Sequence, residues 1–163
     1  TSPTSTVFSI GSGATPDTNA AQDFIAYCFR SIAGVCKVGS YIGTSNDDGS
    51  YITCGFKPSW ILVKCATVSD ASHDWFIFDT TRYIFNGTTT AGGVNGGTLE
   101  ANDTTVEEAH NTNFTDNPAF DILSDGFKLR TNSGTINNTG RTYIYIAMAE
   151  IGGGGTLPPI YGR

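Results

Sequence analysis

Charged residues are scarce in this sequence, and the basic ones are never clustered. Only 15% of the 163 residues are charged, the formal net charge is −6, and no two of the nine Lys and Arg residues are adjacent. Proteins that bind nucleic acids or anionic membrane surfaces gather Lys and Arg on one patch. We therefore expect neither nucleic acid nor membrane among the partners.

Long apolar runs are also missing, and two reactive residue types are rare. No stretch approaches the ~20 apolar residues of a membrane-spanning helix. The chain has two His and one Met. These absences exclude a helical membrane anchor and leave few candidates for a general base or a metal ligand.

The sequence is rich in glycine, threonine, asparagine and aromatic residues in place of charged ones. The chain has 20 Gly, and 12% of its residues are aromatic. Aromatic and β-branched residues favour strands, while Gly and Asn favour the turns between them. A chain of this length buries roughly 70% of the surface of its unfolded form, which is enough for one domain with a core.

Short strand-like runs separated by turn residues dominate the chain. The connections between them are too short for helical crossovers, so antiparallel sheets are predicted. The predicted fold is an all-β, antiparallel β-sandwich, jelly-roll or concanavalin-like, spanning residues 1–151 and followed by a Gly/Pro-rich arm at 152–163. The expected strands are 7–10, 23–32, 35–42, 51–56, 60–65, 75–79, 120–123, 127–131 and 141–151.

Three local patterns refine this prediction. Residues 46–49 (Asn-Asp-Asp-Gly) and Asp125-Gly126 are typical of hairpin connections. Both faces of 141–150 are apolar, so we expect that strand to be central and covered on both sides. The Gly-, Thr- and Asn-rich stretch 86–117 is interpreted as a long loop excursion, in which 104–110 is the best helical candidate.

Two segments of the chain are similar in sequence at an offset of 119 residues. Residues 8–34 align without gaps with residues 127–153, and Ile25 matches Ile144. Each segment consists of a strand, a polar loop and a long strand. Two interpretations stay open: two similar hairpins, or units of a tandem array.

The four cysteines each lie in an apolar run, at positions 28, 36, 54 and 65. In a domain of this size we favour free buried thiols over a disulfide framework. Cys36 and Cys54 are the first pair to test for a disulfide, since their strands resemble hairpin partners.

Reactive constellations are weak, so we predict no catalytic residue, no metal ligand and no cofactor. His73-Asp74 would point to opposite faces of a strand. Residues 107–110 contain a single E-x-x-H, and 46–48 lack the spacing of a calcium loop. Glycoside hydrolysis needs two carboxyl groups about 5–9.5 Å apart. The candidates for such a pair are Asp79, Asp121 and Glu150, and the sequence singles out no pair among them.

Exposed aromatic rings would instead suit the apolar face of a sugar. Core packing is the ordinary alternative for aromatic residues on strands. The predicted glycan or partner contacts are Tyr41, Tyr51, Trp60, Asn113 and Phe114.

Six fragments of the chain form an ordered pattern. They are FIAYCFRSIAG (24–34), KVGSYIG (37–43), GFKPSWILVK (55–64), DWFIFDTTR (74–82), DILSDGFKLRT (121–131) and NNTGRTYIYIAMAEI (137–151). Together they resemble a domain of unknown function that is common in tail-fibre and other virion proteins of marine bacteriophages. The resemblance spans roughly residues 20–151. It implies a β-sandwich, a virion location and oligomerisation, and it carries over no catalytic residue.

We therefore expect a structural virion protein, a tail-fibre or capsid-decoration module that forms a homo-oligomer, with a trimer favoured, and contacts other virion proteins. The alternative is an adhesin that binds a host surface glycan through 86–117. A polysaccharide-degrading enzyme is the third hypothesis, and it would need two of the carboxylates to meet in a groove.

Overall fold

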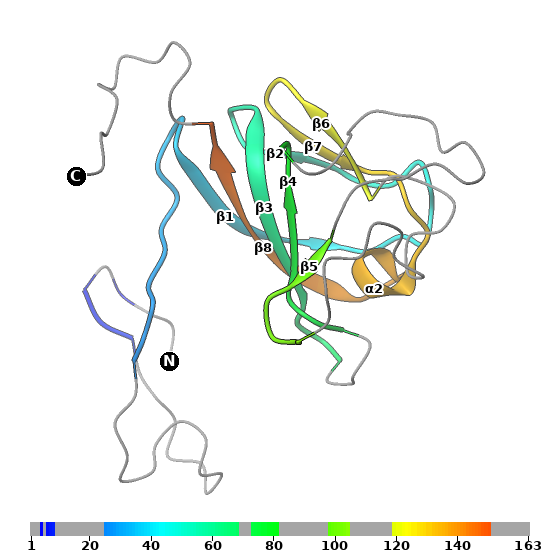
Figure 1. Cartoon of the computed structure of the whole chain (residues 1–163), viewed down its shortest axis with the longest axis horizontal. Coiled ribbons are helices and arrows are strands. Elements are labelled where there is room, and N and C mark those ends of the chain that lie inside the picture. Colours follow the sequence, from blue (N-terminus) through cyan, green and yellow to red (C-terminus); the bar gives the residue numbers. More distant parts are fainter. Residues whose placement is uncertain are drawn as a thin grey trace, which may run out of the picture.

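The fold consists of two antiparallel β-sheets packed face to face, with one short helix beside them (Figure 1). The computed structural model describes residues 4, 6–8, 25–68, 73–81, 98–104 and 119–150. The larger sheet has the strand order β1 (Cys36–Ile42), β8 (Thr142–Ala149), β3 (Pro58–Cys65), β4 (Phe76–Asp79) and β5 (Leu99–Glu100). The smaller sheet has the order β2 (Tyr51–Thr53), β7 (Gly126–Leu129) and β6 (Phe120–Leu123), and the helix is α2 (Gly134–Asn137).

Every ladder between these strands is antiparallel, which confirms the predicted all-β antiparallel sandwich. The predicted Asp125-Gly126 turn joins β6 to β7 as a hairpin. Along β3 and β8 buried residues alternate with more exposed ones, as expected for strands with one face in a core.

Aromatic rings join the inner faces of the two sheets into one core. Phe78 of β4 contacts Phe120 of β6 edge to face at 4.8 Å between ring centroids, and Phe120 contacts Phe127 of β7 at 5.1 Å. Phe127 in turn meets Tyr145 of β8 at 5.4 Å. Such tilted contacts add about 0.5–1.5 kcal/mol each beyond the burial of the rings. The chain of rings therefore fixes the smaller sheet on the larger one.

The Tyr145 ring also extends over β1, where only glycine leaves room for it. A Cβ at Gly39 would lie 2.7 Å from the Tyr145 hydroxyl oxygen. On the same face, Tyr41 stacks on Tyr143 with ring centroids 5.2 Å apart. Tyrosines therefore close the core at the β1 side.

A cluster of polar contacts around α2 closes one end of the sandwich. The Asn137 side chain is fully buried. Its amide oxygen accepts from the Thr44 backbone N–H at 2.8 Å, and its amide nitrogen donates to the carbonyls of Asn46 at 3.0 Å and Thr131 at 2.6 Å. One side chain thus ties the chain segment after β1 to the segments before and within α2.

This cluster of contacts explains why the prediction of a hairpin at residues 46–49 is wrong. β1 belongs to the larger sheet and β2 to the smaller one, so residues 43–50 cross between the sheets. Asn137 holds this crossover from a distant part of the chain. The pairing of Cys36 with Cys54 loses its basis, because their segments are not hairpin partners; all four cysteines are described, and each is a free thiol.

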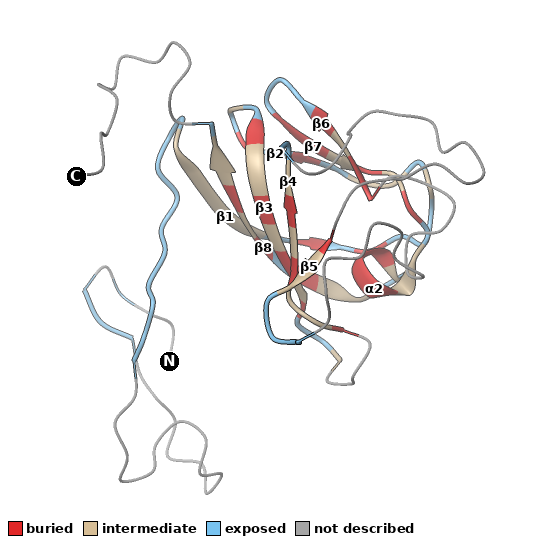
Figure 2. Cartoon of the chain, in the orientation of Figure 1, coloured by how far each residue is buried: buried red, intermediate tan, exposed pale blue. Residues whose placement is uncertain are grey.

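The strand predicted at 23–32 is absent over 25–31, and only Ile32 forms an isolated bridge, with Cys36. Figure 2 shows this segment exposed along its described length. Its residues have the alternation of a strand, but the described part of the chain provides no sheet partner for them. The predicted strand at 7–10 is likewise absent at residues 7 and 8.

Two further predictions need correction. β8 is central, as expected, but its outer face is not fully covered by the described residues, since Ile144 is exposed. The stretch 86–117 is not wholly an excursion, because β5 within it pairs with β4. Most of that stretch, including the helix candidate 104–110 beyond its first residue, and the arm 152–163 lie outside the described residues.

We predict that Asn137→Ala lowers the free energy of unfolding by about 1–3 kcal/mol, because it leaves the carbonyl of the buried Thr131 without its partner and removes the bonds to the backbone of Thr44 and Asn46. Denaturant unfolding followed by circular dichroism measures the change. Asn132→Ala, at an exposed position three residues after β7 ends, is the control and should alter stability by less than about 0.5 kcal/mol. Equal effects of the two substitutions would contradict the role given to Asn137.

Candidate functional site

The outer face of the smaller sheet is polar and carries a row of paired side chains. The strand register places Tyr51 of β2, Lys128 of β7 and Asp121 of β6 side by side across the three strands. Arg130 and Asp48 border this row. Lys128 lies 2.5 Å from the Asp48 carboxylate, and Arg130 lies 3.2 Å from Asp48 and 3.3 Å from Asp121.

The hydrogen bond and charge of Lys128, helped by Arg130, lower the pKa of Asp48 below its ordinary value of 3.8. The Tyr51 hydroxyl donates to Asp125, and this bond raises the pKa of the Tyr51 phenol. At neutral pH the face therefore carries an exposed neutral ring among fixed charges. Such a surface suits a polar, partly apolar ligand such as a sugar.

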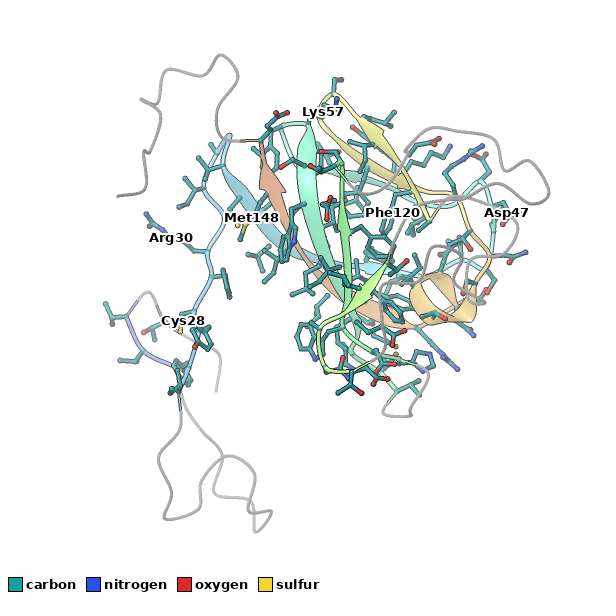
Figure 3. All side chains as sticks on the ribbon, in the orientation of Figure 1. Cys28, Arg30, Asp47, Lys57, Phe120 and Met148 are labelled. Atoms are coloured by element: carbon teal, nitrogen blue, oxygen red, sulfur yellow. The ribbon has the colours of Figure 1, made fainter. Side chains whose placement is uncertain are left out.

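The outer face of the larger sheet is apolar instead. One row crosses four strands in register, from Val38 of β1 through Ile146 of β8 and Leu62 of β3 to Ile77 of β4. All four residues of this row are only half-buried. Figure 3 places Met148, from the neighbouring row, on the side of the sheet that faces Cys28 and Arg30.

This apolar face is hollowed where residue 29 approaches the sheet. The hollow measures about 200 Å³. Its lining is Phe29, Val38, Leu62, Trp75, Ile144, Tyr145 and Ile146. None of these described lining residues is charged, so the hollow suits an apolar group.

A second hollow, of about 240 Å³, lies at the end of the same sheet. It is lined partly by Lys57, Ser59, Thr80 and Glu150, and thus carries one charge of each sign. The charges make it polar.

The predicted contact residues do not gather in one place. Tyr41 was predicted as a contact residue, but it is buried. Its ring is only 7% exposed, and its hydroxyl donates to the Ile136 carbonyl at 2.8 Å inside the core. Tyr51 is 44% exposed on the smaller sheet. Trp60 lies half-buried on the outer face of the larger sheet. Asn113 and Phe114 lie outside the described residues.

The His73-Asp74 pair does not act as a unit. His73 is buried and its ring contacts the Arg141 guanidinium, whereas the Asp74 carboxylate accepts from the Asn102 amide at 2.7 Å. The Glu107 and His110 side chains lie outside the described residues.

Two of the candidate carboxylates point away from each other. Asp79 on β4 and Asp121 on β6 each follow a buried Phe by one residue, so both face outward from their own sheets. Packed sheets lie about 10 Å apart, which already exceeds the ~9.5 Å limit for a glycosidase pair. Glu150 is exposed just after β8. Within the described ranges no three His, Cys, Asp or Glu side chains gather as metal ligands.

The row of ion pairs and the apolar row were not foreseen in the sequence. Each depends on strand neighbours that are distant in the chain, so only the register brings its residues together. The sequence did show that both faces of β8 are apolar. This pattern indicates that the outer face of the sheet is buried by another surface.

Comparison with known proteins identifies a family. A family model described as "Domain of unknown function (DUF7483)" matches residues 1–151. No curated protein and no solved structure matches the chain. Over the described residues, no helix has the length and apolar character needed to cross a membrane.

We expect the Asp48 carboxyl to titrate below pH 3.8, because Lys128 and Arg130 favour its charged form. A depressed pKa stabilises the fold above the unfolded pKa, and that contribution disappears as the pH falls through the folded pKa. Carboxyl NMR shifts followed from pH 7 to pH 2 measure the midpoint.

Lys128→Met should move this midpoint upward toward 3.8, while Lys57→Met, at an exposed lysine on another loop, should leave it in place. A wild-type midpoint at or above 3.8 would show that the pair contributes nothing.

Proposed function

We propose that this chain, which belongs to the family described as a domain of unknown function (DUF7483), is a structural module of a virus particle. It acts through contacts with neighbouring subunits, in a tail fibre or as a capsid decoration. The observation that carries the proposal is the apolar outer face of the five-stranded sheet, which the described residues leave partly exposed.

That face is unusual for an isolated soluble domain. Monomeric proteins rarely expose contiguous apolar patches beyond a few hundred Å² unless the patch binds something. Here a row of large apolar residues crosses four strands, and Ile42 and Ile144 beside it are 54% and 40% exposed. The face is hollowed but offers no reactive group, so burial against another protein surface is the function that it suits best.

The virion location is supported by the ordered resemblance of residues 20–151 to a domain found in phage tail-fibre and other virion proteins. The net charge of −6 keeps the remaining surface soluble. Oligomers of such modules usually have closed symmetry, and a trimer remains our preferred assembly. Other virion proteins are the second class of partner.

The proposal can be tested on purified particles of the virus that encodes this chain. Antibodies raised against the chain should label the particles in electron micrographs, and peptides of the chain should be present in their mass spectra at tens to hundreds of copies. Absence of the chain from intact particles would overturn the virion location. Antibody blocked with the purified chain is the control.

An adhesin that binds a host surface glycan is the second candidate, and the exposed Tyr51 ring favours it. The ring lies next to Lys128 and donates to Asp125. Stacking of a sugar on the ring, with hydrogen bonds from the flanking charges, is the recognition that this surface permits.

We expect glycan binding, if this face provides it, to fall by about tenfold or more in Tyr51→Ala, because the stacking ring is lost. Tyr51→Phe keeps the ring and loses only the bond to Asp125, so it should retain most of the binding. A glycan array followed by calorimetry on the hits measures both. An array without hits, or equal loss in the two variants, would remove this candidate.

A further inference from the structure

Six of the ten exposed large hydrophobic residues of the described chain lie on one segment or on the outer face of the larger sheet. Ile25 and Tyr27 are 83% and 82% exposed, and Phe29 follows them at the same spacing of two residues. They belong to residues 25–32, an extended segment that leads into β1 through a tight turn at Gly34, where φ is 71°. This segment runs beside the larger sheet in Figure 1.

Among the described residues, the backbone of this segment is hydrogen-bonded to the sheet at one end only. Ile32 exchanges two backbone hydrogen bonds with Cys36, and the Ser31 hydroxyl bonds the backbone of Val38. From Ile25 to Arg30 the backbone has no hydrogen bond to any other described residue. An extended apolar segment whose backbone is not part of the described sheet can pack its side chains on an apolar surface of another copy.

The apolar face and the segment match each other. In the internal alignment, Ile25, Tyr27 and Phe29 correspond to Ile144, Ile146 and Met148, which form the outer row of β8. The segment and the floor of the apolar face thus present large apolar side chains at the same two-residue spacing. Two such rows can interdigitate, and Phe29 already lies at the hollow of its own sheet.

We propose that residues 25–32 of one copy of this chain pack on the outer face of the five-stranded sheet of a second copy. Reciprocal exchange of the segments gives a dimer, and cyclic exchange gives a trimer. The inference rests on the proposed role in subunit contacts and names the surface and the partner for it.

The area available agrees with a stable contact. A large aromatic side chain offers about 150–250 Å², so the exposed parts of the apolar residues present on the order of 600 Å², near the ~800 Å² that each partner contributes to a stable interface. These residues are Ile25, Tyr27, Phe29, Ile32, Ile42 and Ile144.

Charge does not oppose the contact between copies. The rows that the register places on this outer face contain one basic and one acidic residue, Lys64 and Asp79. The excess of acidic residues therefore lies elsewhere, and like-charge repulsion does not keep two copies apart at this surface.

The experiment measures self-association of the full chain by light scattering and native mass spectrometry between about 1 and 100 μM, the range of typical stable oligomers. We expect a dimer or trimer. Tyr27→Asp on the segment and Ile144→Asp on the face should each weaken association by about 100-fold or more, because each buries a charge in an apolar contact. Leu123→Asp is the matched control, since Leu123 is 36% exposed on the other sheet, and its affinity should change by less than about threefold.

A second measurement separates contact between copies from contact within one copy. A photoreactive benzoylphenylalanine in place of Tyr27, in a mixture of isotopically light and heavy chains, should give light–heavy cross-links to β1, β3 or β8. Thermal melting by circular dichroism verifies that each variant is folded.

A monomeric wild-type chain at 100 μM, an oligomer that persists in both aspartate variants, or cross-links only within one copy would each overturn the inference. These outcomes are independent of the particle test, because a chain found in virions can still be monomeric in solution. Conversely, self-association through this face would stand even if the chain were absent from particles.

Discussion

The packing of aromatic rings between the two sheets is the constraint on which the rest of the structure depends. The rings of Phe78, Phe120, Phe127 and Tyr145 come from four strands of both sheets and form one continuous line of tilted contacts. Tilted rings in contact leave little freedom to slide. Once these inner faces are joined, the side chains that alternate with them must point outward, so the core also determines what each outer face presents.

The two outer faces have opposite characters as a result. On the smaller sheet, lysine, arginine and aspartate satisfy one another, and the surface is stable in water without a partner. On the larger sheet the outward side chains are mostly apolar. One face has its charges paired, and the other exposes apolar side chains that a partner could bury. Such a molecule is suited to assembly in a defined orientation, with the polar side toward solvent or a ligand.

The sequence predicted most of the strands because alternation is a local property. It could not assign strands to sheets, since the crossover after β1 is held by Asn137, about ninety residues away along the chain. The segment 25–32 has the pattern of a strand, yet a pattern reports which side chains share a face and not whether a partner strand exists. The four-residue helix α2 is too short to show helical periodicity.

The same limit applies to the candidate site. Tyr41 and Trp60 both occur in strands, and only the register of β1 and β3 on β8 shows that Tyr41 points into the core while Trp60 points outward. Tyr51, which the sequence suggested as a contact residue, is exposed, but its charged neighbours come from β6 and β7. Chemistry assembled across strands stays hidden until the register is known.

The placement of the thiols has a consequence for where such a protein can exist. Cys54 and Cys65 are buried, and burial raises the pKa of the Cys54 thiol to about 11, so this sulfur behaves as a small apolar filler. Buried thiols are shielded from oxidants, so these two side chains keep the same covalent form in reducing and in oxidising surroundings. Oxidation would therefore act first at Cys28, which is the exposed one among the four cysteines.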